Sequence, residues 1–327
     1  ALLIGGGAYF VKNFKVAGLD KLSIHPVSEE KPVEPDPLDD VMFVSSRPDS
    51  TVVPPTNVVA PPGLQPRDVD HLRIGSWAMS GFGPSKLADD SARINLMRII
   101  RQFDVIALQQ ITADERDLIP RLVEELNEGG RTFDYALGEP SGPVERSEQL
   151  AILFNVDRVH IDRSQTYSVS DPQNRMTYDP MVAWFRAAEP PPEYAWTFTV
   201  VNVRINLSRA AAEVALLPTL FSSVRSDGRG EDDVVMAGLF QADDSYMIPS
   251  VMGTGVAAAV RSTPTDIFNR HQTSNLLVDE SHTNEYVGLG GPDDFLRAFN
   301  LNLCEAEAVS SHLPVFAEFT ATEGGLR

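Results

Sequence analysis

Short apolar runs alternate with longer amphipathic stretches from residue 71 to the end of the chain. The apolar runs predict strands at 72–79, 105–108, 150–154, 182–185, 196–203, 234–237, 276–278 and 315–319. Helical spacing predicts helices over 87–101 and 209–224, and Pro218 should bend the second one. Thr112 to Glu115 has the sequence of a capping box and predicts another helix, which should end before Gly129. Strands that alternate with helices predict an α/β domain.

The region before this domain has a different composition. Residues 26–70 are rich in proline and carry acidic clusters, which favours an extended spacer or a strap along a surface. We therefore expect a proline-rich, acidic linker at 16–70, a folded domain at 71–322 and a short tail at 323–327.

Residues 1–11 are apolar, start without Met and are followed by Lys12. They are too few to cross a bilayer, which takes about 20 residues. One interpretation is the distal end of a membrane anchor or signal segment, covering 1–15. The alternative is a buried helix or strand of a soluble protein. We favour the anchor, because the folded domain has no need for this segment, and we expect an extracytoplasmic, periplasmic domain rather than a soluble cytoplasmic one.

The composition narrows the possible partners. The chain has 327 residues, 43% of them hydrophobic, and a net charge of −19 with a pI of about 4.6. Such an acidic chain should repel the phosphates of nucleic acids, so no nucleic-acid partner is expected. Cys304 is the single cysteine, which excludes an intrachain disulfide and predicts a small buried side chain.

Several segments match one known family in order and spacing. They are residues 72–79 (LRIGSWAM), 103–111 (FDVIALQQI), 146–150 (RSEQL), 198–204 (FTVVNVR), 234–243 (VVMAGLFQAD), 274–279 (SNLLVD) and 309–315 (VSSHLPV). Together they resemble the endonuclease/exonuclease/phosphatase superfamily, which has the deoxyribonuclease I-like fold. The resemblance implies a four-layered α/β sandwich of two packed mixed β-sheets flanked by helices, here with an extended N-terminal proline-rich arm.

The resemblance also identifies the positions of the family's catalytic site. Most of them carry other residue types in this chain: Ala78, Gln110, Arg204, Leu239, Gln241, Ser274 and Ser311. By the resemblance, Gln110 replaces the glutamate that binds Mg²⁺, Leu239 an aspartate that orients the attacking group, and Arg204 a catalytic histidine. Two positions keep the family's residue, namely Glu148 and His312.

These replacements remove four carboxylates from one pocket, at Gln110, Leu239, Ser274 and Ser311. Magnesium prefers carboxylate ligands, and phosphoryl transfer of this kind depends on the metal with an acid and a base. The sequence therefore predicts no metal, no cofactor and no catalytic residue. It favours a catalytically inactive domain that serves as a membrane-tethered structural or interaction subunit and binds protein partners.

Other interpretations stay open. Arg204 should form an ion pair with Glu148, or it should bind a phosphate or carboxylate ligand together with His312. The domain could instead be a phosphodiesterase or phosphatase with a displaced site, for which Asp243, Asp244, Glu148 and His312 are the candidates. Asp243 and Asp244 are more simply interpreted as caps of a short helix. Three tryptophans are expected to be packing residues: Trp77, Trp184 and Trp196.

Overall fold

The computed structural model describes residues 70–128, 130, 132–253 and 255–324. The expected anchor at 1–15 and the linker up to residue 69 lie outside these ranges. Within them, no helix combines the length and the apolar character needed to cross a membrane.

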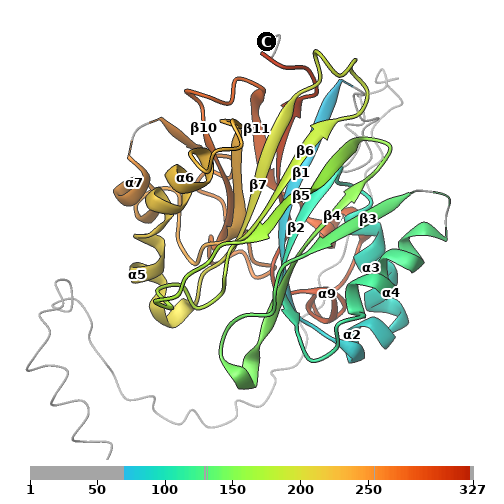
Figure 1. Ribbon diagram of the computed structural model, residues 1–327. Coiled ribbons are helices and arrows are strands. Elements are labelled where there is room, and N and C mark those ends of the chain that lie inside the picture. The colour runs from blue at the N-terminus through green and yellow to red at the C-terminus, as the bar shows by residue number, and fades with distance from the viewer. Residues whose placement is uncertain (1–69, 129, 131, 254, 325–327) are drawn as a thin grey trace, which may run out of the picture. The chain divides into compact units, whose positions relative to one another are not determined.

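Two six-stranded sheets pack face to face (Figure 1). The strand order of the first sheet is β11 (Tyr286–Pro292), β12 (Val315–Thr320), β1 (His71–Phe82), β2 (Val105–Thr112), β4 (Glu148–Asn155), β3 (Phe133–Leu137). The order of the second sheet is β5 (Val159–Ser168), β6 (Met181–Ala187), β7 (Thr197–Arg204), β8 (Val234–Leu239), β10 (Ser274–Asp279), β9 (Val256–Ala258). Each sheet contains one parallel pair, β1–β2 or β7–β8, so both are mixed.

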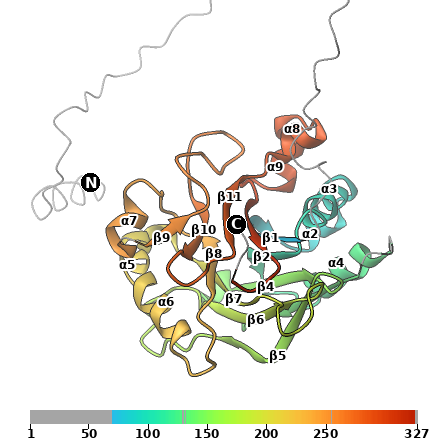
Figure 2. The same ribbon diagram turned by 90° about the horizontal axis from the view of Figure 1, so that it is seen from above.

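Helices cover the outer faces of the two sheets, as Figure 2 shows from above. Beside the first sheet lie α2 (Pro84–Ala88), α3 (Asp90–Ile100), α4 (Leu118–Asn127), α8 (Phe295–Phe299) and α9 (Leu303–Val309). Beside the second lie α5 (Ala210–Val214), α6 (Leu217–Arg225) and α7 (Met247–Met252). Single turns of 3₁₀ helix occur at Val144–Arg146 and Leu207–Arg209. The layers are therefore helix, sheet, sheet and helix, which confirms the expected fold class.

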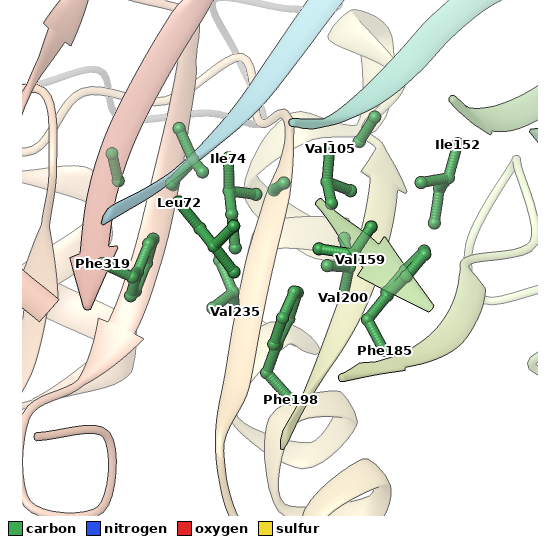
Figure 3. Close-up of a cluster of buried hydrophobic side chains, with 14 of the residues drawn as sticks. Leu72, Ile74, Val105, Ile152, Val159, Phe185, Phe198, Val200, Val235 and Phe319 are labelled. Carbon is green, nitrogen blue, oxygen red and sulfur yellow. The ribbon is translucent and has the colours of Figure 1, made fainter. Parts of the chain in front are cut away.

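The alternation of side chains along the strands produces three separate hydrophobic clusters. In β2, Val105 and Ala107 face the second sheet, whereas Ile106 and Leu108 pack against the helices. The cluster between the sheets includes the aromatic rings of Phe185, Phe198 and Phe319 (Figure 3). Trp196 stacks on Phe198 with ring centroids 4.1 Å apart and on Phe319 of the opposite sheet at 4.9 Å. These contacts hold the two sheets together at the end where β7 begins.

A polar bridge joins the sheets toward the other end. Gln109 Nε2 donates to Asn202 Oδ1 at 2.7 Å, and Asn202 Nδ2 donates to the carbonyl oxygens of Leu108 and Ala151 at 3.0 and 2.9 Å. Gln109 and Asn202 are fully buried. Buried amides are stable when their hydrogen bonds are made, and they then favour one arrangement of the sheets over others.

The predicted helices differ from the observed ones. The helix expected over 87–101 is two helices, because Asp89 has an extended backbone and its side chain accepts a hydrogen bond from Ala92 N at 2.9 Å, which starts α3. The helix expected over 209–224 is also two helices. Pro218 lies in the first turn of α6, where a missing N–H costs nothing, so it starts a helix rather than bending one.

Two further expectations were wrong. Thr112 ends β2 and α4 begins only at Leu118, so the capping-box pattern at 112–115 does not start a helix. Cys304 is exposed, because α9 turns Ala306 and Val309 toward the core and Cys304 away from it. The tryptophan interpretation holds: Trp77 and Trp196 are fully buried, and Trp184 is partly buried.

Candidate functional site

The positions predicted from the sequence motifs meet at one end of the sandwich. Ala78 and Gln110 lie near the ends of the parallel strands β1 and β2, and Glu148 starts β4 at the same end, opposite Thr112. In the second sheet, Leu239 pairs with Arg204 on one side and with Ser274 on the other. Ser311 and His312 lie just before β12. We refer to this end of the sandwich as the motif pocket.

A bulge shapes the first-sheet side of the motif pocket. The register of β2 shifts between Leu108 and Ile111 against β4, and Gln110 has a φ of 61°. Gln110 Oε1 accepts a hydrogen bond from Ser80 N at 3.0 Å. Ser80 Oγ lies 2.7 Å from Ser311 Oγ and accepts from Ser311 N at 3.0 Å. Gln110 and Ser311 are therefore linked through Ser80, a residue that sequence reasoning missed.

Lys86 is a second residue that the motifs did not identify. Its ammonium donates to the carbonyl oxygens of Met79 at 2.8 Å, Val309 at 2.9 Å and Ser80 at 3.3 Å. Burial lowers the pKa of Lys86 to about 8. The lysine thus places a positive charge near Ser80, held by backbone carbonyl oxygens. The sequence hints at this contact only through Pro84, which starts a helix between Ser80 and Lys86 and so can turn the lysine back toward Ser80.

The expected ion pair between Glu148 and Arg204 is present. Arg204 Nε lies 3.1 Å from Glu148 Oε2, and Nη2 donates to Oε1 at 3.4 Å. Nη1 donates to the carbonyl oxygen of Ile205, and the guanidinium lies over the ring of Tyr178 at 4.9 Å from its centroid. Both charged side chains are mostly buried, with 11% and 17% exposed. The pair joins β7 of the second sheet to β4 of the first.

His312 is neutral in this environment. Burial lowers the pKa of its imidazole to about 4, and the charges of Arg204 and Lys86 act in the same direction, while Asp266 opposes them. The ring Nδ1 lies 3.4 Å from Thr273 Oγ1, and the backbone oxygen of His312 accepts a hydrogen bond from Trp77 Nε1 at 2.9 Å. A neutral imidazole within the electrostatic reach of a permanently charged guanidinium can accept a proton or hydrogen-bond an anion.

The remaining motif positions do not present reactive groups to this pocket. Ala78, Leu239 and Ser274 are fully buried, and Ser274 Oγ has no hydrogen-bond partner. Gln241 has a φ of 54° and its backbone N–H donates to Thr273 O. Asp243 Oδ1 accepts from the N–H groups of Ser245 and Tyr246 just before α7, in keeping with a capping role. Asp244 instead accepts from Ser262 N at 2.8 Å.

The donor set at the family's metal position does not fit Mg²⁺. Ala78 and Leu239 offer no side-chain oxygen, and the amide oxygen of Gln110 is occupied by Ser80 N. Two positive groups, Lys86 and Arg204, lie at the same end of the sandwich. A small hard cation prefers carboxylates and water as ligands, and nearby positive charges weaken its binding further. We therefore assign no step of any reaction to magnesium at this position.

Breaking the Glu148–Arg204 pair should destabilise the fold. Arg204→Met leaves the Glu148 carboxylate in a mostly buried place without its partner, which costs about 3 kcal/mol of unfolding free energy. Combining it with Glu148→Gln should recover part of the loss, measured by urea unfolding of all four proteins in the cycle. Arg163→Met, which removes an exposed pair with Asp134, is the matched control and should cost less than about 1 kcal/mol. Strictly additive effects at Glu148 and Arg204 would rule out a direct interaction.

The lowered pKa of His312 predicts a dependence of stability on pH. The folded state binds fewer protons at this residue than the unfolded state when the pH lies between about 4 and 6.5. The contribution of His312 to the free energy of unfolding is thus complete above about pH 6.5. It is lost as the pH falls toward 4, and the loss amounts to about 3 kcal/mol at most. Wild type should lose more unfolding free energy than His312→Gln between about pH 7 and about pH 5. Replacing the exposed His160 with Gln should leave the wild-type pH dependence intact. Equal losses in wild type and His312→Gln would show that the imidazole is not shielded.

Known proteins share both sequence and fold with this chain. It is 26% identical to deoxyribonuclease gamma of Rattus norvegicus over 264 residues, which cover 75% of this chain and 83% of that protein. It is 24% identical to deoxyribonuclease-1-like 2 of Homo sapiens over 283 residues, covering 75% of this chain and 90% of the other. No family model matches the chain.

Solved structures of low sequence identity have the same fold. An endonuclease/exonuclease/phosphatase family protein from Bacteroides thetaiotaomicron aligns with a TM-score of 0.52 at 15% identity, over 76% of this chain and 97% of that one. The human Nocturnin catalytic domain with a bound sulfate anion aligns with a TM-score of 0.52 at 11% identity, over 77% and 94% of the two chains.

The prediction that the domain is not an enzyme is contradicted by these comparisons. The relatives that match three quarters of this chain are named deoxyribonucleases, which points to hydrolase activity. The physical reason for the error is that the substitutions were counted only as lost metal ligands. Loss of those ligands removes one catalytic route, whereas Arg204 and a neutral His312 remain together in the motif pocket.

The expected superfamily is confirmed at two levels, by sequence similarity along the domain and by the arrangement of the two sheets. The chain is thus similar in sequence to deoxyribonuclease I-like proteins and has the fold of the endonuclease/exonuclease/phosphatase superfamily.

Proposed function

We propose that the domain hydrolyses phosphate esters in the motif pocket, using Arg204 and His312 instead of magnesium at the family position. The observation that carries this proposal is that a permanent positive charge and a neutral imidazole lie at the same end of the sandwich: Arg204 pairs with Leu239, Leu239 with Ser274, and Thr273 lies against His312. The likeness to deoxyribonucleases supports the reaction class.

Arg204 supplies the charge that a phosphate requires. A guanidinium has five N–H donors. In Arg204, Nε and Nη2 each donate one hydrogen bond to Glu148, and Nη1 donates one to the carbonyl oxygen of Ile205. The remaining N–H groups on Nη1 and Nη2 are free of these bonds and suit phosphate oxygens, which guanidinium groups recognise well. Glu148 and Tyr178 hold the guanidinium in place, so little side-chain entropy is lost when a ligand binds.

His312 supplies the group that moves a proton. A neutral imidazole can accept a proton from an attacking water or from a hydroxyl group. Its lowered pKa makes it a weak base in the free protein, but a bound phosphate would counter the positive charges nearby and raise that pKa. Substrate binding would therefore increase the basicity of the residue that the reaction needs.

The overall charge favours a small substrate over a long polyanion. With a net charge of −19, the chain repels an extended phosphate backbone, while a small phosphate ester needs only the local charge of Arg204. We therefore propose small phosphomonoesters or phosphodiesters as substrates. DNA, which the names of the relatives suggest, is the second candidate.

Turnover of a generic substrate tests the proposal. The full chain should release p-nitrophenol from p-nitrophenyl phosphate or its bis ester without added Mg²⁺, and His312→Ala should lower kcat/KM by about a hundredfold or more, as expected for loss of an acid–base group. His160→Ala, an exposed histidine, is the matched control and should retain full activity. Turnover that is equal in His312→Ala, or that is absent from wild type on both esters and on DNA, would refute the proposal.

We also propose that this domain is held at a membrane surface and contacts protein partners there. The apolar segment 1–11 and the proline-rich linker at 26–70 support this arrangement, since the linker would separate the domain from the membrane. In a lysate of cells that make the full chain, the protein should sediment with membranes and be released by detergent rather than by salt. Release by salt alone, or recovery of the chain with the soluble proteins, would argue against the tether.

A further inference from the structure

A cluster of acidic side chains lies at the opposite end of the sandwich from the motif pocket. Asp233 directly precedes β8, Glu285 directly precedes β11, and Glu323 follows β12. Each offers one carboxylate oxygen, and the three oxygens lie within 4.8 Å of one another. Because β8 runs from Val234 to Leu239, the cluster and the motif pocket are separated by the length of that strand, about 17 Å.

Two of these carboxylates are buried and only partly satisfied. Asp233 is 3% and Glu285 is 2% exposed. Trp196 Nε1 donates to Asp233 Oδ2 at 2.9 Å, and Gly324 N donates to Glu285 Oε1 at 2.6 Å. The other oxygens, Asp233 Oδ1 and Glu285 Oε2, are buried and have no hydrogen-bond partner. Each carboxylate is thus oriented through one oxygen, while its second oxygen is left for another partner.

The charges around these groups are unfavourable without a cation. Burial raises the pKa of Asp233 to about 8; the neighbouring charges of Glu285 and Glu231 add to the effect, and the Thr283 hydroxyl and the Trp196 indole oppose it. Burial also raises the pKa of Glu285 and of Glu323. Unpaired buried oxygens and clustered like charges are both costly, and a bound cation relieves both costs at once.

We propose that Asp233, Glu285 and Glu323 bind a divalent cation of the calcium class. Calcium takes oxygen ligands at about 2.3–2.6 Å in irregular geometries, so oxygens on opposite sides of one ion lie roughly 5 Å apart, which accommodates this cluster. Magnesium requires shorter distances and a nearly octahedral arrangement, which three carboxylates from separate connections provide less readily. Glu323 is exposed and gives the ion access from solvent.

The position of this site suggests a structural role. Asp233 belongs to the second sheet, whereas Glu285 and Glu323 flank strands of the first. A shared ion would therefore clamp the sheets together at the end where Trp196 stacks on Phe319. The site does not depend on the proposed hydrolase activity, because it uses other residues at the other end of the strands.

Terbium luminescence tests the site, since Tb³⁺ occupies calcium sites and accepts energy from nearby indoles. The full chain should show saturable emission on excitation of tryptophan, because the Trp196 indole is hydrogen-bonded to Asp233. Added Ca²⁺ should displace the emission at lower concentration than Mg²⁺. Glu285→Gln and Glu323→Gln should each weaken binding by about tenfold or more, as expected for the loss of a charged ligand. Glu124→Gln, on the exposed face of α4, is the matched control and should bind as wild type does.

Thermal unfolding gives an independent readout. At a hundredfold excess over its Kd, Ca²⁺ should raise the melting temperature by roughly 5 °C or more, and Glu323→Gln should lose most of this shift while still folding, because its side chain is exposed. Emission and melting temperature that do not respond to Ca²⁺ up to about 10 mM, well above the weakest calcium modules, would overturn the proposal and indicate carboxyl groups that share protons. Tighter binding of Mg²⁺ than of Ca²⁺ would overturn the assignment to the calcium class.

Discussion

The arrangement of the motif pocket depends on the buried amide bridge between Gln109 and Asn202. Two sheets that met only through apolar side chains could slide against each other at little cost, because hydrophobic contact has no direction. The bridge fixes one register, since Asn202 also binds the carbonyl oxygens of Leu108 and Ala151 on neighbouring strands of the opposite sheet. Arg204 follows Asn202 by two residues on the same strand, so it faces the first sheet and reaches Glu148 there.

A bulge in β2 lies directly beside this bridge. Gln109 points into the core and Gln110, with its φ of 61°, is turned toward Ser80 at the surface of the pocket. A regular strand would also place these neighbours on opposite faces, but Gln110 would then point into the layer of helices. The left-handed residue thus redirects one side chain to the end of the sandwich without disturbing the buried partner next to it.

The sequence predicts the internal strands of both sheets but not the edge strands. Every strand with neighbours on both sides was predicted, and the mainly apolar β2 and β8 are examples. The four that were missed, β3, β5, β9 and β11, are the edge strands of the two sheets. Edge strands are partly exposed, as the mixed burial of β5 shows, so their sequences lack the pattern on which strand prediction relies.

The sequence predicted where the motif pocket lies, but not all the side chains that form it or their charge states. Motif spacing identified Arg204, Leu239 and Ser274, and strand register brings them together. Ser80 and Lys86 could not be identified from the sequence, because their roles come from a turn after β1 and a helix that directs an ammonium back to backbone carbonyl oxygens. The neutral state of His312 could not be predicted either, because it results from burial and from the charges of Arg204 and Lys86, which only the folded structure brings near the imidazole.

The buried strand end at Gly238 and Leu239 restricts which side chains this part of the motif pocket can accommodate. Leu239 is fully enclosed, and a side chain at position 238 would clash with the backbone oxygen of Val203. An aspartate introduced alone at position 239 would be a buried charge, tolerated only if neighbours such as Ser274 changed with it. An acidic side chain at this strand end would therefore need matching changes at the residues that enclose Leu239.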